Sequence, residues 1–289
     1  MSIEVRQFLG LSNESGPFES LHINQNICSP QSTLYGGCAL ALAIEYLESK
    51  YERNLVMAST QFIGQSYSGQ ALRFASTTGV NGKSFTQSTV NTYADGKHQF
   101  QTQGSLGSRQ TPCEIRGKKA PLDVLHPLDC KRVPHLEFTE GFISPRFEIR
   151  HDPNLNPFSP NSSNKVSPTS PTLSTFWAQM PECLEVSAAS LAILADIAPS
   201  ATNMWTGQFM IASSLDNTIR ILNLAQSDWI LCEMELSGIN HGIAHTTMNM
   251  WNEDGVLLAV ASQSYILRPL EMFKQFNNDN LAEAAERIS

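Results

Sequence analysis

The stretch that decides the fold runs from Trp229 to Pro269 and reads WILCEMELSGINHGIAHTTMNMWNEDGVLLAVASQSYILRP. Apolar-rich runs flank the pair Asp254-Gly255. Asp-Gly between such runs predicts a β-hairpin, because a type I′ turn needs positive φ at both central residues. A third run, residues 229–236, precedes the other two. We therefore predict a three-stranded antiparallel meander.

Gln263 is a polar residue on the mostly apolar face of the last predicted strand. Counting by twos, that face carries Leu257, Ala259, Ala261, Gln263, Tyr265 and Leu267. A buried amide needs hydrogen-bond partners. We therefore expect Gln263 either to meet a polar group on another element or to serve a ligand.

The same design occurs earlier in the chain, where Asp95-Gly96 lies between runs rich in Thr, Val, Phe and Tyr. The two Asp-Gly glycines, Gly96 and Gly255, are 159 residues apart. This interval pairs Asn81 with Asn240, Gly104 with Gln263, and Gly37 with Asp196. The pattern predicts one unit present in two tandem copies that have diverged at several of these positions.

Two helices and several boundaries complete the predicted α+β organisation. Gly36-Gly37 precedes a strongly periodic helix, and a second helix is predicted over 181–203, with a break near Pro199. We place the N-terminal unit at residues 1–125 and a connection at 126–171, which includes a loop rich in Pro, Asn and Ser. The C-terminal unit covers residues 172–289, with a candidate first strand at 146–150.

Composition narrows the classes of function. Of the 289 residues, 41% are hydrophobic, which is typical of a globular protein. The net charge is −8, and no basic face offsets it, so we expect no nucleic-acid partner. The six cysteines show neither CxxC nor metal-ligand spacing, so we expect reduced thiols and no metal site. No apolar run is long enough for a membrane helix. We expect a cytoplasmic protein without membrane insertion.

Asp196 is the most unusual charged residue of the second predicted helix. Its neighbours are apolar, and no Lys, Arg or His lies within ten residues on either side. A buried carboxylate without a partner costs several kcal/mol. We therefore expect one of three situations. The Asp196 carboxylate faces solvent, it accepts hydrogen bonds from residues distant in the sequence, or it takes part in catalysis.

These features together resemble the acyl-CoA thioesterase II (TesB-like) family, which has a double hotdog fold. The matching segments are Tyr35-Gly36-Gly37, Ala195-Asp196, Ser213-Ser214-Leu215-Asp216, Asp254-Gly255-Val256-Leu257 and Val260-Ala261-Ser262-Gln263. The resemblance covers residues 31–269 apart from the linkers. It implies an acyl-CoA substrate, a role in lipid and fatty acid metabolism, and two tandem hotdog units, each with antiparallel strands wrapped around a helix.

In that family an Asp, a hydroxyl residue (usually Thr) and a Gln hold and activate the water that attacks the thioester carbonyl. By position these residues are Asp196, Ser214 and Gln263, with Ser213 as a neighbouring alternative for the hydroxyl. The reaction that the resemblance implies needs no metal or organic cofactor. Gly37, at the helix start, would leave backbone N–H groups exposed for an oxyanion. The family commonly has Gln after the Gly-Gly pair, where this chain has Cys38.

Two other functions remain open from the sequence. One is a catalytically silent protein that binds acyl thioesters, which the Thr-to-Ser change and Cys38 mildly favour. The other is an enoyl or hydroxyacyl thioester hydratase. That chemistry generally uses an Asp/His pair, and no His lies near Asp196 or Gly37 in the sequence. The edge strands of a sheet expose unpaired N–H and C=O groups that can pair with another chain, so we also expect a homodimer or higher homo-oligomer.

Overall fold

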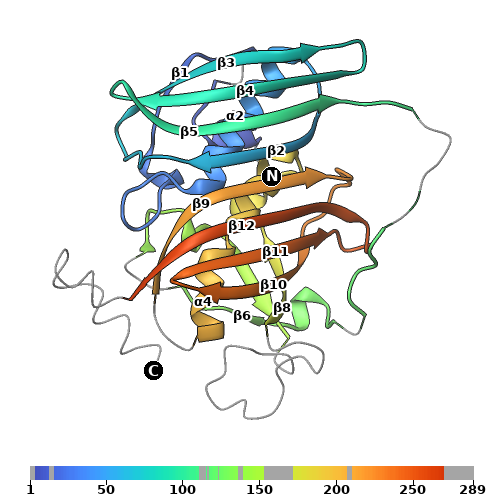
Figure 1. Ribbon diagram of the computed structural model, residues 1–289. Coiled ribbons are helices and arrows are strands. Elements are labelled where there is room, and N and C mark those ends of the chain that lie inside the picture. The colour runs from blue at the N-terminus through green and yellow to red at the C-terminus, as the bar shows by residue number, and fades with distance from the viewer. Residues whose placement is uncertain are drawn as a thin grey trace.

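The computed structural model describes residues 4–12, 16–110, 115, 117–122, 124–135, 139–152, 172–206 and 210–269. Its strands form one 12-stranded sheet in the order β1-β3-β4-β5-β2-β9-β12-β11-β10-β8-β7-β6 (Figure 1). Every pairing in it is antiparallel. The large antiparallel sheet with few helices agrees with the predicted α+β class.

The first half of the sheet comes from the N-terminal part of the chain. Its strands are β1 (Ser20–His22), β2 (Leu55–Phe62), β3 (Ala71–Asn81), β4 (Phe85–Ala94) and β5 (Lys97–Gly107). The predicted Asp95-Gly96 turn joins β4 to β5, and both of its residues have positive φ, as a type I′ turn requires.

The second half contains the predicted meander. Its strands are β6 (Lys131–Arg132), β7 (Glu148–His151), β8 (Leu173–Gln179), β9 (Met210–Ile221), β10 (Ile230–Asn240), β11 (Ile243–Trp251) and β12 (Leu257–Pro269). The candidate strand at 146–150 corresponds to β7, whereas Arg146 itself ends the short 3-10 helix η4 (Ser144–Arg146).

The type I′ prediction for Asp254-Gly255 is wrong. Only Gly255 has positive φ, and β12 resumes at Leu257, so the loop is longer than two residues. Gly255 N–H donates to the Asn252 carbonyl at 3.0 Å, and Val256 N–H donates to Asn252 Oδ1 at 2.8 Å. The Asn252 side chain therefore stabilises a wider turn that the Asp-Gly pair alone does not reveal.

The two halves meet where β2 pairs with β9, from Met57↔Arg220 to Gln61↔Asp216. At the middle of this seam, the hydroxyls of Ser59 and Thr218 lie 2.8 Å apart. The seam makes one continuous sheet of both halves, so residues from either half can contribute to a site beside it.

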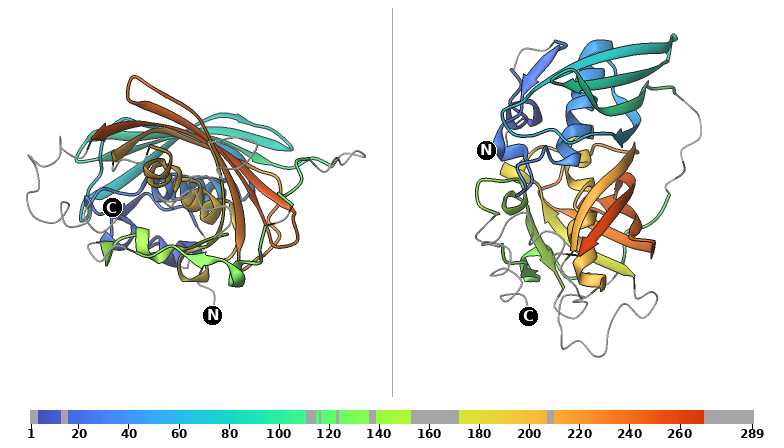
Figure 2. Two further views of the ribbon diagram at one scale, coloured as in Figure 1. Left: turned by 90° about the horizontal axis from the view of Figure 1, so that it is seen from below. Right: turned by 60° about the vertical axis from the view of Figure 1, so that its left-hand side comes forward.

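The helices lie on one side of this sheet, which curves around them (Figure 2). They are α1 (Val5–Phe8), α2 (Gly36–Tyr51), α3 (Ala188–Ala195) and α4 (Ala198–Thr206), with further 3-10 turns η1 (Gln25–Ile27), η2 (Pro127–Asp129) and η5 (Pro181–Cys183). Helix α2 buries 11 consecutive residues between the sheet and α3, from Gly37 to Leu47. This apolar layer is the core that fixes the start of α2 against α3.

The predicted single helix over 181–203 is wrong in its details. Residues 181–183 form η5, and the long helix is interrupted at Asp196 and Ile197 instead of near Pro199. Pro199 lies in the first turn of α4, where a missing N–H costs little. Asp196 therefore occupies the junction of two helices and not the interior of one.

The last residues of the predicted N-terminal unit pack on the outer face of the second half. The indoles of Trp177 and Trp251 donate to the Leu125 and Lys118 carbonyls at 2.9 and 3.2 Å. Ala120 and Val124 contact a small buried cluster that contains Trp177, Trp229 and Trp251. The tryptophans thus hold residues 118–122 and 124–125 against the second half. Most of the Pro/Asn/Ser-rich loop, and residues 270–289 of the predicted C-terminal unit, lie outside the described residues.

No helix in the described ranges combines the length and apolarity needed to cross a membrane.

Candidate active site

Asp196 lies at the junction between α3 and α4, as the C-cap residue of α3. A reciprocal capping box between Ser187 and Ser190 fixes the other end of that helix, and the Ile197 N–H closes its last turn on the Leu194 carbonyl at 3.1 Å. The Asp196 side chain is only 3% exposed. The local fold thus holds a carboxylate in a buried position at a helix end.

Four donors converge on the Asp196 carboxylate. Gly37 N–H donates to Oδ2 at 2.9 Å. On Oδ1, the Gln263 Nε2 group makes a short contact, the Ser214 hydroxyl donates at 3.4 Å, and the Asn217 Nδ2 group donates at 3.5 Å. Gln263 Nε2 also donates to Ser214 Oγ at 2.8 Å. The structure therefore brings together all three side chains that the sequence proposed, and adds Asn217.

These hydrogen bonds and burial have opposite effects on the pKa of Asp196. Burial raises the pKa of Asp196 to about 6, while the hydrogen bonds from Gly37, Gln263, Ser214 and Asn217 act to lower it. None of the salt bridges between described residues involves Asp196. A carboxyl in this state is ionised near neutral pH and still basic enough to accept a proton.

A β-bulge in β9 shapes the site. Ser264 pairs with Asp216 but Tyr265 pairs with Ser214, so Leu215 is an extra residue opposite β12. Leu215 and Asp216 both line the outer face of the sheet, whereas Ser214 and Asn217 both reach Asp196 on the inner face. The bulge therefore places two polar side chains at the carboxylate, where regular alternation would give one.

The bulge also separates the two candidate hydroxyls. Ser213 Oγ accepts a hydrogen bond from Arg268 at 2.7 Å, while Ser214 contacts both Asp196 and Gln263. Ser214 is therefore the serine of this cluster.

The Gly36-Gly37 pair allows α2 to approach Asp196 closely. A Cβ on Gly36 would lie 2.8 Å from Asp196 Oδ2 and 3.1 Å from Phe62 Cζ. A Cβ on Gly37 would lie 2.7 Å from the Ile193 carbonyl oxygen. Both positions thus need a residue without a side chain. The N–H of Gly37, expected to face an oxyanion, is already bonded to Asp196.

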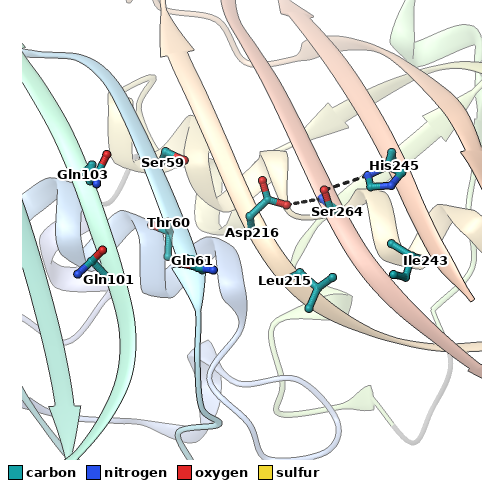
Figure 3. Close-up of a pocket in the computed structure, with 10 residues that line it drawn as sticks. All are labelled: Ser59, Thr60, Gln61, Gln101, Gln103, Leu215, Asp216, Ile243, His245 and Ser264. Atoms are coloured by element: carbon teal, nitrogen blue, oxygen red, sulfur yellow. Dashed lines mark hydrogen bonds between the residues drawn. The ribbon is translucent and has the colours of Figure 1, made fainter.

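A polar depression of about 480 Å³ lies on the opposite face of the sheet (Figure 3). It spans the seam and contains Asp216, Ser264 and His245, with Ser264 Oγ 3.0 Å from His245 Nδ1. Ser264 follows Gln263 directly, so the strand points the two side chains to opposite faces. The depression is therefore separate from the Asp196 cluster.

Neither a metal nor a disulfide is indicated within the described part of the chain. No group of three or more His, Cys, Asp or Glu side chains there could hold a metal ion. The five described cysteines are free thiols. Cys38, in the place of the family's usual Gln, is fully buried, and its pKa is raised by burial and by Asp196 nearby.

Sequence and structure comparisons point to one family. The sequence model of the acyl-CoA thioesterase C-terminal domain matches residues 127–267. A candidate thioesterase from Novosphingobium aromaticivorans superposes with a TM-score of 0.74 at 25% identity, covering 89% of this chain and 97% of its own. A search of curated proteins gives no significant match.

Two further solved structures show the fold. The tesB protein of Mycobacterium avium subsp. paratuberculosis has a TM-score of 0.70 at 16% identity, over 92% of this chain and 98% of its own. A hot dog fold protein of Alicyclobacillus acidocaldarius has a TM-score of 0.74 at 15% identity, with the same coverage of both chains. The large antiparallel sheet around its helices is thus a hotdog-type architecture.

Proposed function

We propose that the chain is a thioester hydrolase of the acyl-CoA thioesterase family, and that Asp196, Ser214 and Gln263 hold the water that attacks the thioester. The match of residues 127–267 to the C-terminal domain of that family supports the proposal. The reaction is the hydrolysis of an acyl-CoA to a free acid and CoA. The observation that carries the assignment is the convergence of these three side chains on one buried carboxylate.

The proposed roles follow from the hydrogen-bonding capacity of each group. A water that enters between the three side chains would accept a hydrogen bond from the Gln263 amide and donate one to Asp196. Asp196 takes a proton as the water oxygen bonds to the thioester carbonyl carbon. Collapse of the tetrahedral intermediate breaks the carbon–sulfur bond, and the proton passes to the departing thiolate. Ser214 fixes the orientation of both Gln263 and Asp196.

We propose a different role for Gly37 than the sequence first implied. Its N–H donates to Asp196 Oδ2 at 2.9 Å, which holds the carboxylate in place and favours its ionised form. The remaining N–H groups at the start of α2 are the proposed donors for the oxyanion, because a helix N-terminus favours negative charge.

We further propose that the chain consists of two tandem hotdog units with one working site. The 159-residue interval supports this, since Gly37 and Asp196 contact each other and so do Ser59 and Thr218. The counterparts of Asp196, Ser214, Asn217 and Gln263 are Gly37, Leu55, Ala58 and Gly104. None of these four has a polar side chain. A Cβ on Gly104 would lie 2.5 Å from Leu47 Cδ1, so an apolar side chain fills the space there.

The hydratase alternative finds no support at this site. The hydrogen-bond partners of Asp196 are a backbone N–H, a hydroxyl and two amides. His245, the histidine nearest in sequence to Gln263, lies on the other face of the sheet. A silent binding protein is the alternative that a direct assay must address.

The test is release of free thiol from acyl-CoA substrates of graded chain length by the purified chain and its Asp196→Asn variant. We expect wild-type hydrolysis, and a loss in kcat of about 10²–10⁴-fold in the variant, because Asn cannot accept the proton. Asp216→Asn is the matched control, since this carboxylate faces away and accepts from the Ser264 N–H at 2.7 Å. An Asp196→Asn variant as fast as wild type would exclude the proposed base.

A further inference from the structure

We propose that Asn217 is a positioning residue for thioester hydrolysis, which holds Asp196 through both of its protonation states. This inference rests on the proposed function and adds to it a residue that the sequence did not single out. Asn217 acts through Asp196 and is not proposed to touch the substrate.

The burial and the hydrogen bonding of the Asn217 side chain are those expected of a residue that acts during the reaction. The side chain is fully buried, and its Nδ2 group donates to Asp196 Oδ1 at 3.5 Å. Its Oδ1 atom has no donor among the described residues, and neither has Gln263 Oε1 on the adjacent strand. A buried acceptor without a donor destabilises the folded state, because it has lost its hydrogen bonds to water. Two such acceptors beside one carboxyl indicate a site that a donor occupies during the reaction.

Asn217 belongs to a polar row that crosses the inner face of the sheet. The row runs through Thr102, Thr60, Asn217, Gln263 and Thr246, which pair in register on adjacent strands. The Thr60 and Thr102 hydroxyls bond to each other at 2.7 Å. The Asn217 amide, next in the row, donates to Asp196 instead.

An amide suits this place because it both donates and accepts. While Asp196 is ionised, Asn217 Nδ2 donates to its oxygen. After Asp196 takes the proton from the attacking water, the new carboxylic O–H needs an acceptor. Rotation of the Asn217 amide supplies Oδ1 for that bond, and the Gln263 Oε1 atom is a second acceptor beside it. The proton then leaves with the thiolate, and the amide returns to its first orientation.

The charge of Asp196 depends on few other groups. From the start of α2, Tyr35 and Cys38 face it, and burial followed by the Asp196 charge raises the pKa of both well above their ordinary values. Both are therefore neutral near pH 7. Arg146 acts to lower the pKa of Cys38 but is not among the groups that shift Asp196. β9 and β12 contribute only neutral donors, and the Phe62 ring lies nearby from β2.

The experiment compares the pH dependence of kcat in wild type, Asn217→Leu and Asn217→Asp. Asn217→Leu removes a donor to the anion, so we expect the acid limb of the profile to move up by about 1 pH unit and kcat to fall about tenfold. Asn217→Asp preserves shape and places a second carboxyl beside the first, so its acid limb should move further up.

The matched control is the double variant Thr60→Val/Thr102→Val, which makes the neighbouring part of the row apolar. Replacing both partners of a hydrogen bond is nearly neutral, so its pH profile should match wild type. An acid limb that stays unchanged in Asn217→Leu and Asn217→Asp would overturn the inference, whatever their thermal stability. If Asp196→Asn is inactive in that case, the proposed function still stands. If Asp196→Asn is fully active, both fail.

Discussion

The backbone N–H of Gly37 donates to Asp196 Oδ2 at 2.9 Å, and the two residues are 159 positions apart in the chain. Ser59 and Thr218, whose hydroxyls meet at the seam, have the same separation. Two copies related by a pseudo-two-fold axis would bring such counterparts into contact, so both pairs support the proposed duplication. The helix start of the first half thereby orients the carboxylate of the second. Neither half alone contains the complete cluster.

This close approach predicts different effects for two adjacent glycines. In Gly36→Ala the new methyl meets the Asp196 carboxylate and should displace it. We expect kcat to fall by about 10²-fold with a modest change in stability, because small displacements at a reacting centre are costly. In Gly37→Ala the methyl meets the α3 backbone, so overpacking should lower the free energy of unfolding by about 1–3 kcal/mol.

Steady-state kinetics and denaturant unfolding of the two variants measure these effects. Gly117→Ala is the control, since a Cβ there meets nothing within 4 Å. Equal kcat in Gly36→Ala and wild type would contradict the predicted geometry.

The bulge in β9 predicts that adjacent serines differ in function. Ser214→Ala removes the bonds to Gln263 at 2.8 Å and to Asp196 at 3.4 Å, so we expect kcat to fall about 10- to 100-fold. Ser214→Thr retains the hydroxyl that the family usually has and should keep most of the activity. Ser213→Ala is the matched control, because its hydroxyl bonds to Arg268. The prediction fails if the two alanine variants have the same kcat.

The raised pKa of Asp196 predicts the acid limb of the activity profile. Burial raises this pKa to about 6, and the proposed base works only when ionised. The rate of thiol release should therefore increase with pH through about pH 6 and level off above it. Measurement of kcat/KM from about pH 4.5 to 8, with circular dichroism to monitor folding, tests this. Asp216→Asn should keep the same limb, and a wild-type profile flat across pH 6 would argue against Asp196 as base.

Sequence periodicity was sufficient for most strands because alternation and turn residues are local signals. The meander over 230–269 and the earlier strands β4 and β5, on either side of Asp95-Gly96, follow the predicted pattern. The repeat interval even paired Gly37 with Asp196, which are in contact. The location in the cytoplasm and the homodimer stay predictions, the second of which light scattering can test.

Asn217 could not be predicted because its orientation depends on an irregularity. Strict alternation along β9 would place Ser214 and Asn217 on opposite faces, and only the extra Leu215 puts both on one. The predicted helix break near Pro199 differs from the observed break at Asp196 for a similar reason. Proline is the local signal for a break, but here the approach of α2 stabilises the junction three residues earlier.

Glu48 predicts how stability depends on pH away from the proposed site. Its carboxylate accepts from the Leu55 N–H at 2.6 Å, yet burial raises its pKa from 4.5 to about 7. The folded state therefore binds a proton here more tightly than the unfolded chain does. The stability that this proton contributes is fully present below about pH 4.5 and is lost as pH rises through about 7.

Glu48→Gln stays neutral and keeps an acceptor for Leu55, so it should gain stability over wild type as the pH rises. We expect the difference in the free energy of unfolding to grow by about 1–3 kcal/mol between pH 5 and pH 8, in favour of Gln. Denaturant unfolding at both pH values measures it, with the exposed Glu52, where Glu52→Gln should change little, as the control. A constant difference between Glu48→Gln and wild type at the two pH values would show that Glu48 is ionised in the folded protein.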